Sequence, residues 1–528
     1  MLIGDALTAS ARRFPNKVAL VDESGGGAYS KLETAANNLA RCLVELGLVE
    51  GSNAGIFARN SIDYAVAYFG MAKAGCVSVN VPWKASPGEF EQLITRCDAR
   101  LLIVGDEQLP KIRDRLTNLP NLEKIVVINR DPKRSGLRAG ELDFRDWLGT
   151  GVSKFSKSRL TSSTPLAICF SGGTTGMPKA ILSQHLSCST RAMIGAVEFG
   201  DDENEVIALT PPLSYSNNQV RLLGGIMLGA TVVLMGSWSA SKFLDFVNKY
   251  NVTSAVLVPT QIGDLLADPN FKPRDTGTLK KFQYGAAPMP DSFVAALQRD
   301  FPHIELTEFY GLTETGYLTI KRPFHLRSKS ACTGRVTFGL EVAIFDSGGN
   351  ELPLGATGEI VARGDHLVPH YYGDQAMTTA LLKYGGGWIA TGDLGVLDED
   401  GFLTIVGRIK ELINSGGEKI APAEVENALL RHPDVAECAV IGIPDKRRGE
   451  VPGAYVVLAP DATAGEAELI DFRCQEIDRY KRPREIQFIA TLPRTSAGKI
   501  DKPALQAGAE SAAAGGGEDR PKIGVFSA

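Results

Sequence analysis

Apolar and polar positions alternate along the first 150 residues in stretches that predict strands and helices in turn. Short apolar runs bounded by polar residues predict strands at 54–58, 76–81, 101–104 and 124–128. Apolar residues at helical spacing predict one helix from Ser30, which forms a capping box with Glu33, to Gly47, and another at 62–74 that Gly75 ends. This alternation predicts a parallel sheet with helices on its faces.

The pattern continues after residue 164 and changes after residue 334. Strands are predicted at 166–170, 206–209, 231–235 and 254–258, and helices at 240–250 and 291–300. The charged connection at 130–163 is expected to be a solvated loop. Short β-like runs follow at 341–345, 358–363, 388–390 and 402–406, with hairpin turns at 346–350 and 398–401. From about residue 407, helices are predicted at 423–430 and 467–477, and strands at 436–441, 453–458 and 485–488.

We therefore predict an α/β protein. A large N-terminal domain, 1–406, has parallel-type sheets flanked by helices plus a β-rich subdomain. Residues 407–411 are a hinge, and 412–506 form a small, mobile α+β domain. The Ala/Gly/Glu-rich stretch 507–528 is expected to be a disordered tail.

Length, composition and charge restrict the kind of protein. The 528 residues exceed one ordinary core, and 44% hydrophobic with 22% charged residues is typical of soluble globular chains. A net charge of −5 indicates no nucleic-acid partner. No apolar run reaches the roughly 18 residues of a membrane span, and the N-terminus lacks a secretory pattern. Eight cysteines lie singly, without metal or disulfide spacing. We expect a cytoplasmic protein with reduced thiols.

The richest candidate for chemistry is the nine-residue loop 171–179, Ser-Gly-Gly-Thr-Thr-Gly-Met-Pro-Lys, which follows an apolar strand. Glycines let backbone N–H groups approach an anion, and the three hydroxyls and the lysine add donors and charge. A plain surface turn is the alternative. The loop is not a Walker A motif, because Met177 and Pro178 separate Gly176 from Lys179.

Five further short motifs combine glycines, hydroxyls, carboxylates and lysines. The first joins an aromatic ring to hydroxyls and a carboxylate that could hold Mg²⁺ through oxygen. The second is expected to end a strand and to place a carboxylate near ribose hydroxyls. In chain order they are Tyr-Gly-Leu-Thr-Glu-Thr-Gly at 310–316, Thr-Gly-Asp at 391–393, Gly-Arg-Ile-Lys-Glu at 407–411, Ser-Gly-Gly-Glu-Lys at 415–419 and Pro-Arg-Thr-Ser-Ala-Gly-Lys-Ile at 493–500.

In this order and spacing the motifs resemble the adenylate-forming enzymes, which include acyl- and aryl-CoA synthetases, luciferases and peptide-synthetase adenylation domains. The resemblance covers about residues 10–502 and is closest to acyl-CoA ligases. It implies that a carboxylate attacks the α-phosphorus of ATP to give an acyl-adenylate and pyrophosphate. A thiol then displaces AMP. ATP, Mg²⁺ and CoA are the implied co-substrates and cofactor.

The resemblance also implies a role for each motif. Thr313 and Lys499 would act on the reacting phosphate and carboxylate, with Glu314 as both a catalytic residue and the Mg²⁺ ligand. Lys410 would be the hinge about which the small domain turns between the half-reactions. The implied ATP-binding residues are Ser171, Gly172, Gly173, Thr174, Thr175, Gly176, Lys179, Gly285, Ala286, Ala287, Tyr310, Asp393 and Arg408. The implied pantetheine or CoA residues are Ser415, Gly416, Gly417 and Arg447.

The sequence identifies the acid substrate less closely than it identifies the nucleotide. The implied acyl pocket comprises Tyr215, Ser216, Asn217, Gln219 and Gly311. Many relatives carry a histidine at the position of Tyr215, and this chain continues with polar residues up to Arg221. Buried polar groups require partners, so a small, aromatic or functionalised acid is expected. The alternative is that only alternate residues face the pocket.

The acceptor and the assembly stay open at this point. Lys446, Arg447 and Arg448 could meet CoA phosphates or form a solvated turn. A stand-alone enzyme that loads an acid onto a phosphopantetheinyl carrier protein is the main alternative. A catalytically silent nucleotide-binding protein and a luciferase-like oxidation are further ones. A homodimer is left open.

Overall fold

The computed structural model describes residues 1–129, 136–151, 154–155, 159–171, 178–271, 276–326, 332–368, 370–459, 462–473, 477–494 and 500–514. The chain divides into two compact units. The first comprises Met1–Met289, Ala295–Val342 and Ala362–Ile389, and the second comprises Pro290–Val294, Ala343–Val361 and Ala390–Ala528. The predicted hinge at 407–411 lies inside the second unit, and the division of the chain at that point stays a prediction.

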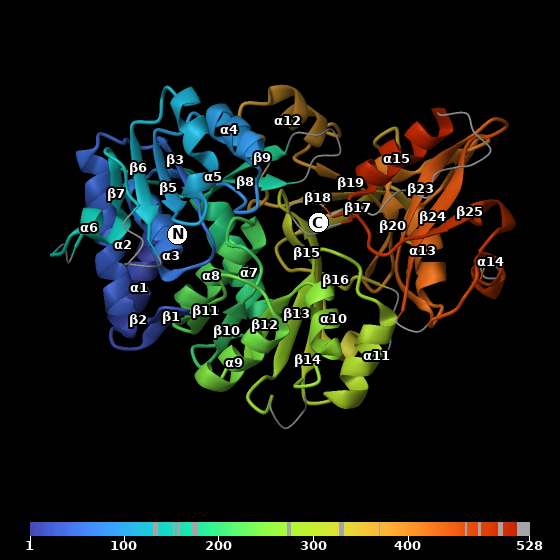
Figure 1. Ribbon diagram of the computed structural model, residues 1–528, viewed down its shortest axis with the longest axis horizontal. Coiled ribbons are helices and arrows are strands. Elements are labelled where there is room, and N and C mark those ends of the chain that lie inside the picture. The colour runs from blue at the N-terminus through green and yellow to red at the C-terminus, as the bar shows by residue number, and fades with distance from the viewer. Residues whose placement is uncertain are drawn as a thin grey trace. The chain divides into compact units, whose positions relative to one another are not determined.

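The first unit contains two sheets (Figure 1). The seven-stranded sheet is parallel except at its β9 edge, as the alternation of strands and helices predicts. In spatial order its strands are β7 (Glu141–Asp143), β6 (Lys124–Ile128), β5 (Leu101–Gly105), β3 (Asn53–Phe57), β4 (Val77–Asn80), β8 (Pro165–Ser171) and β9 (Lys179–Gln184).

The nine-stranded sheet brings distant parts of the chain together. Its strand β1 pairs in parallel with β11, and Figure 1 shows the blue β1 beside the green β11. In spatial order its strands are β16 (Arg335–Val336), β15 (Gly316–Lys321), β14 (Glu305–Leu312), β13 (Lys281–Gly285), β12 (Ser254–Leu257), β10 (Val206–Leu209), β11 (Thr231–Leu234), β1 (Val18–Asp22) and β2 (Gly25–Ala28).

Five long helices and the short helix α6 (Phe144–Leu148) share one hydrophobic core with both sheets. Ile56 and Ile103 of the first sheet and Ile207 and Val232 of the second belong to the same buried cluster. The five long helices are α1 (Ile3–Arg13), α2 (Tyr29–Glu45), α3 (Ile62–Ala74), α7 (His185–Glu198) and α8 (Ser216–Leu228). The other helices of this unit are α4 (Pro87–Arg96), α5 (Leu109–Ile112), α9 (Ala240–Tyr250), α10 (Pro259–Ala267), α11 (Asp291–Asp300, whose first residues cluster with the second unit) and α12 (Gln375–Leu381), with 3₁₀ turns η1 (Arg113–Asn118) and η3 (Pro323–His325).

The second unit contains a five-stranded sheet whose two faces are both covered. Alternate residues point to opposite faces of a strand. Accordingly, Val440 packs with helix residue Val425, whereas its neighbours Ala439 and Ile441 pack with Leu505. The sheet comprises β22 (Glu418–Ile420), β21 (Ile413–Ser415), β24 (Gly449–Leu458) and β23 (Val435–Asp445), with β25 (Glu485–Phe488) paired to β24. Its helices are α13 (Pro422–Leu430), α14 (Glu466–Arg473) and α15 (Lys502–Ala514), with 3₁₀ turns η4 (Ile409–Glu411) and η5 (Arg479–Lys481).

A four-stranded sheet lies largely in the second unit and accounts for the β-rich texture after residue 334. Its strands are β17 (Glu341–Phe345), β18 (Thr357–Arg363), β19 (Ile389–Leu397) and β20 (Leu403–Arg408). The turn at Asp398–Gly401 joins β19 to β20 as an antiparallel hairpin, which confirms that prediction.

Four local expectations are wrong. Ser30 does not cap α2, whose N-cap is Ala28; the Glu33 carboxylate instead bonds Thr8 and Lys73, because a buried tertiary partner outweighs a local cap. The connection at 130–163 is not all solvated loop, since it contains β7 and α6 with Phe144 and Leu148 buried.

The other two corrections concern strand and helix ends. The Thr391–Asp393 motif lies inside β19 and not at a strand end. The tail expected from Ala507 begins as α15, because alanine is the best helix former and Leu505 anchors the helix to the sheet. All seven cysteines in the described part of the chain are buried. No helix in that part of the chain is long and apolar enough to cross a membrane.

Candidate active site

The glycine-rich loop is closed by an antiparallel pair of strands. Ser171 ends β8 and Lys179 begins β9, and the two residues are cross-strand partners. Residues 172–177 lie outside the described residues, and they include the predicted phosphate-binding residues Gly172, Gly173, Thr174, Thr175 and Gly176. Lys499 also lies outside the described residues. The strand that the sequence predicts before the loop is therefore present, and β9, which was not predicted, begins where the loop ends.

A relay of three polar side chains leads from Lys179 to Glu314. The Lys179 ammonium donates to the Tyr371 hydroxyl at 3.3 Å, and that hydroxyl donates to Glu314 Oε1 at 2.5 Å. Burial and the neighbouring carboxylate raise the pKa of Tyr371, so the hydroxyl keeps its proton and holds the carboxylate as an acceptor. The structure thus brings together two predicted residues, and Tyr371, which sequence reasoning missed, connects them.

A second residue that sequence reasoning missed supports the backbone at Thr313 and Glu314. Arg191 is buried on α7 and donates to the carbonyl oxygens of Thr313 at 2.9 Å, Glu314 at 2.5 Å and His366 at 3.2 Å. Burial lowers its pKa, and the carbonyl oxygens supply the acceptors that a buried guanidinium requires. A lone arginine among small residues of a helix was the signal in the sequence.

The residues expected at adenine lie at the carboxyl ends of neighbouring strands. Gly285 ends β13, and Tyr310 is in β14, the adjacent parallel strand. Gly285 is required by packing, since a Cβ there would lie 2.7 Å from the Phe309 ring. Ala286 is exposed with φ 69°, a left-handed conformation that costs a non-glycine residue on the order of 1–3 kcal/mol. Such strain is typical of functional sites, and Ala287 beside it is also exposed.

The segment expected at the acid forms the start of α8. Tyr215 is its N-cap, and burial raises the pKa of the Tyr215 phenol to about 12. Ser216 and Gln219 are buried, whereas Asn217 is half-buried. Gly311, the remaining acyl-pocket residue, packs backbone to backbone against Gly316 across the β14–β15 pair. This contact alone requires a glycine at 311.

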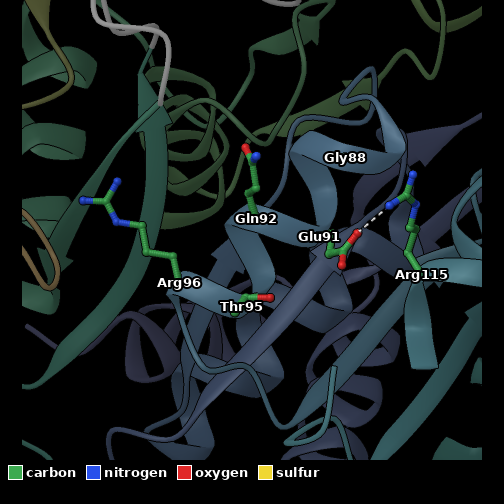
Figure 2. Close-up of a pocket in the computed structure, with 6 residues that line it drawn as sticks. All are labelled: Gly88, Glu91, Gln92, Thr95, Arg96 and Arg115. Carbon is green, nitrogen blue, oxygen red and sulfur yellow. Dashed lines mark hydrogen bonds and ion pairs between the residues drawn. The ribbon is translucent and has the colours of Figure 1, made fainter. Parts of the chain in front are cut away.

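A separate hollow of about 530 Å³ lies on the outer side of α4 (Figure 2). Across it Glu91 pairs with Arg115 at 3.1 Å, and Arg96 donates to the Pro178 carbonyl at the end of the glycine-rich loop at 3.1 Å. Its lining residues are Gly88, Glu91, Gln92, Thr95, Arg96 and Arg115. None of the residues predicted for the acid or the nucleotide is among them.

In the second unit, the two residues expected at the ribose are paired with each other. Asp393 and Arg408 are opposite residues of β19 and β20, and Arg408 Nε lies 3.1 Å from Asp393 Oδ1. The Asp393 side chain is 4% exposed and that of Arg408 is 48% exposed, so the guanidinium is the accessible member. The structure brings these two predicted residues together.

The expected hinge residue, Lys410, is exposed in the 3₁₀ turn η4. The next residue, Glu411, is fixed by Lys502, whose ammonium lies 2.9 Å from it and 2.8 Å from Glu426 of α13. Burial lowers the pKa of Lys502, but the two carboxylates outweigh this effect and hold the pKa above its usual value. Sequence reasoning missed Lys502.

The glycine-rich bend at Ser415–Gly417 lies beside the basic turn that joins β23 to β24. The Gly416 N–H donates to the Arg448 carbonyl at 2.8 Å, and Ser415 pairs with Gly449. Gly416 and Gly417 are exposed with φ of 64° and 95°. Lys446, Arg447 and Arg448 are also exposed. Two motifs that are separate in sequence therefore form one surface of bare backbone and positive charge.

The Glu314 carboxylate is suited to bind a magnesium ion whose other ligands are phosphate oxygens of the substrate and water. It is 5% exposed, with one oxygen fixed by Tyr371. Among the described residues no group of three or more His, Cys, Asp or Glu side chains could form a protein cage for a metal. Mg²⁺ commonly uses one or two carboxylates plus phosphate oxygens and water, so a single carboxylate satisfies that requirement.

Comparison with known proteins agrees with this arrangement. Residues 7–372 match the model of the AMP-binding enzyme family, and 424–499 match that of the AMP-binding enzyme C-terminal domain. The chain is 32% identical to an indoleacetate–CoA ligase of Aromatoleum aromaticum over 92% of this chain and 94% of the relative. It is 31% identical to a fatty acid–acyl-carrier-protein ligase of Streptomyces coeruleorubidus over 93% of both.

A solved structure shares the same fold over nearly the whole length. An anthranilate CoA ligase in complex with anthranoyl-AMP superposes with a TM-score of 0.89 at 28% identity, covering 97% of this chain and 98% of the other. The family match covers more than half of the residues and includes both parts of the site in the first unit, the loop ends and the Tyr310–Glu314 segment. This chain belongs to the AMP-binding enzyme family.

Proposed function

We propose that this chain is an ATP-dependent carboxylate–CoA ligase acting on a small, aromatic or functionalised acid. The observation that carries the proposal is the relay from Lys179 through Tyr371 to Glu314, which joins the end of a phosphate-type loop to a carboxylate suited to Mg²⁺. The relatives named for indoleacetate and anthranilate support an aromatic acid.

In the first half-reaction, an oxygen of the substrate carboxylate bonds to the α-phosphorus of ATP, and the bond to pyrophosphate breaks. The loop residues 171–179 hold the β- and γ-phosphates, and Thr313 donates to the α-phosphate. Glu314 holds Mg²⁺, which when bound offsets the charge that gathers on the phosphate oxygens. Lys499 stabilises the developing charge at the reacting centre without transferring a proton. Asp393 and Arg408 bind the ribose, and Tyr310 with Gly285, Ala286 and Ala287 encloses the adenine.

In the second half-reaction, the CoA sulfur bonds to the acyl carbon, and the bond to AMP breaks. Rotation at Lys410 removes Lys499 from the reacting centre and presents Ser415–Gly417 to the pantetheine arm. The exposed basic turn beside Gly416 supports CoA as the acceptor, because CoA carries phosphates that a cationic surface attracts. Arg447 is the residue of that turn that we assign to CoA.

The second candidate acceptor is a phosphopantetheinyl carrier protein, which the Streptomyces relative's name supports. One experiment separates the two. The enzyme is supplied with ATP, Mg²⁺ and an acid that it adenylates, then with CoA or with a holo-carrier protein, and the products are identified by mass spectrometry. CoA acylation supports the proposal, and acylation of the carrier alone overturns the choice of acceptor.

A further inference from the structure

A buried ion pair lies between the end of α7 and the helix α8. Arg221 Nη1 is 2.6 Å from Asp201 Oδ2, and the two side chains are 2% and 0% exposed. Charged side chains are rarely buried this completely unless they are paired or serve a ligand. Arg221 lies six residues beyond Tyr215, in the segment expected at the acid.

The charge of this pair is already balanced inside the protein. Lys281 lies 3.8 Å from Asp201 Oδ1 and 2.6 Å from Glu205, so two cations face two carboxylates. The cluster therefore requires no further ion for neutrality. It leaves one acceptor, Asp201 Oδ1, and a larger set of donors without hydrogen-bond partners among the described residues.

Three buried donors have no partner among the residues that the structure describes. They are Arg221 Nε, Arg221 Nη2 and the hydroxyl of Tyr317. Buried polar groups in native proteins are nearly always satisfied, and an unsatisfied donor pays its full desolvation penalty. Several unused donors at one place are best explained by an acceptor that arrives with a ligand.

The donors lie next to the predicted acid site. The Arg221 guanidinium carbon lies 4.8 Å from the centre of the Phe199 ring, and the Tyr317 ring packs edge-on against the same ring at 5.3 Å. Phe309 completes the aromatic group at 5.4 Å from Tyr317. Tyr317 is the cross-strand partner of Gly311, and Phe309 directly precedes Tyr310.

We propose that Arg221 and Tyr317 bind an oxygen acceptor on the acid, at the end of the acid away from its reacting carboxylate. The inference rests on the proposed ligase function and narrows its substrate class to acids that carry a hydroxyl, carbonyl or similar oxygen on an aromatic or comparably flat body. Phe199 and Phe309 contact that body, and the paired Asp201 fixes the orientation of the guanidinium.

The test compares matched acids that differ by one oxygen. ATP–pyrophosphate exchange is measured with benzoate against 3- and 4-hydroxybenzoate, with cinnamate against 4-coumarate, and with hexanoate against 6-hydroxyhexanoate. The wild-type enzyme is expected to prefer the oxygen-bearing member of at least one pair. Tyr317→Phe removes only the hydroxyl and is expected to lower that preference about tenfold in kcat/KM.

A second variant and a control keep the result interpretable. Arg221→Lys retains the charge opposite Asp201 but removes the Nε and Nη2 edge, and it is expected to reduce the same preference. Tyr68→Phe removes a buried hydroxyl from α3 and is expected to leave the preference unchanged.

The inference is overturned if the wild-type enzyme prefers the unsubstituted acid in every pair. Equal effects of Tyr317→Phe and Arg221→Lys on both members of a pair would also overturn it, because the donors would then be structural. Either result leaves acid-dependent exchange intact, and with it the ligase function. Absence of exchange with every acid would instead overturn the ligase function, and the inference with it.

Discussion

The Tyr371 hydroxyl donates to Glu314 Oε1 at 2.5 Å, across 57 residues of sequence. Lys179 donates to the same hydroxyl, so the end of the phosphate-type loop and the candidate magnesium ligand share one phenol. A hydrogen bond to a carboxylate fixes its orientation, which a metal ligand requires in addition to its charge. Tyr371 is therefore a positioning residue for Glu314.

Tyr371→Phe is expected to raise the Mg²⁺ concentration for half-maximal pyrophosphate exchange by about fivefold to tenfold, as loss of a bond worth about 1 kcal/mol would do. The saturated rate should change less. Tyr372→Phe is the matched control, since its hydroxyl bonds Asn53 and not Glu314. An unchanged Mg²⁺ dependence in Tyr371→Phe would show that the hydrogen bond does not position the ligand.

The basic turn beside Gly416 is expected to bind the phosphates of CoA. Replacing Lys446 and Arg447 by alanine, while Arg448 keeps its packing beside Gly416, should raise KM for CoA about tenfold at low salt and less at high salt. Pantetheine, which lacks the phosphates, should be used with an unchanged KM. Arg299→Ala removes an exposed charge elsewhere and serves as the control. Equal effects on CoA and pantetheine would exclude a phosphate-binding role.

The ion pairs of Lys502 with Glu411 and Glu426 are expected to fix Glu411, so that the hinge rotation takes place at residues before it. Lys502→Met leaves two partly buried carboxylates without their cation, which should cost about 1–3 kcal/mol. Tryptic cleavage after Arg408 or Lys410 should then become several-fold faster. Lys419→Met removes an exposed lysine nearby and should leave those rates unchanged. Equal cleavage rates in Lys502→Met and wild type would contradict this role.

The buried side chain of His185 predicts that the free energy of unfolding falls as the solution becomes acidic. His185 is 0% exposed, its Nδ1 accepts from the Ile3 N–H at 3.1 Å, and burial lowers its pKa from 6.5 to about 4. The unfolded chain therefore takes up a proton near pH 6.5, and the folded chain only near pH 4. The stabilisation is complete above about pH 6.5 and is lost as the pH falls toward 4, with a size of about 3 kcal/mol.

The measurement is the free energy of unfolding in urea between pH 7 and 4. His185→Asn retains an acceptor near the Nδ1 position and cannot titrate, so its stability should fall less steeply with acid. His303→Asn, at an exposed position, should keep the wild-type slope. The same slope in His185→Asn would exclude His185 as the cause.

Local signals in the sequence were sufficient for much of the fold. The helix at 62–74 was predicted to the residue, because the Ser61 side chain caps its first turn and Gly75 ends it at φ 77°. The helix at 240–250 has the same kind of signals in Ser239 and Asn251. Where a tertiary contact competed, prediction failed. Glu33 bonds Lys73 instead of capping its helix.

The candidate site was predictable where it lies in short motifs and not where it depends on distant partners. Glu314, Lys179, Asp393 and Arg408 were recognised from contiguous residues. Tyr371 and Lys502 were not, because their partners are 57 and 91 residues away and no local pattern marks them. Lys499 and the loop interior stay predictions, and the variants below test the first of them.

The most direct test of the account is acid-dependent ATP–pyrophosphate exchange, measured alongside thioester formation from supplied acyl-adenylate. We expect the wild-type enzyme to show both and Lys499→Ala to lose exchange while largely keeping thioester formation. Lys410→Pro should show the reverse, because a fixed φ hinders rotation at the hinge. Unimpaired exchange in Lys499→Ala, or no exchange in the wild-type enzyme with any aryl, short, medium or hydroxylated acid, would contradict the proposed function.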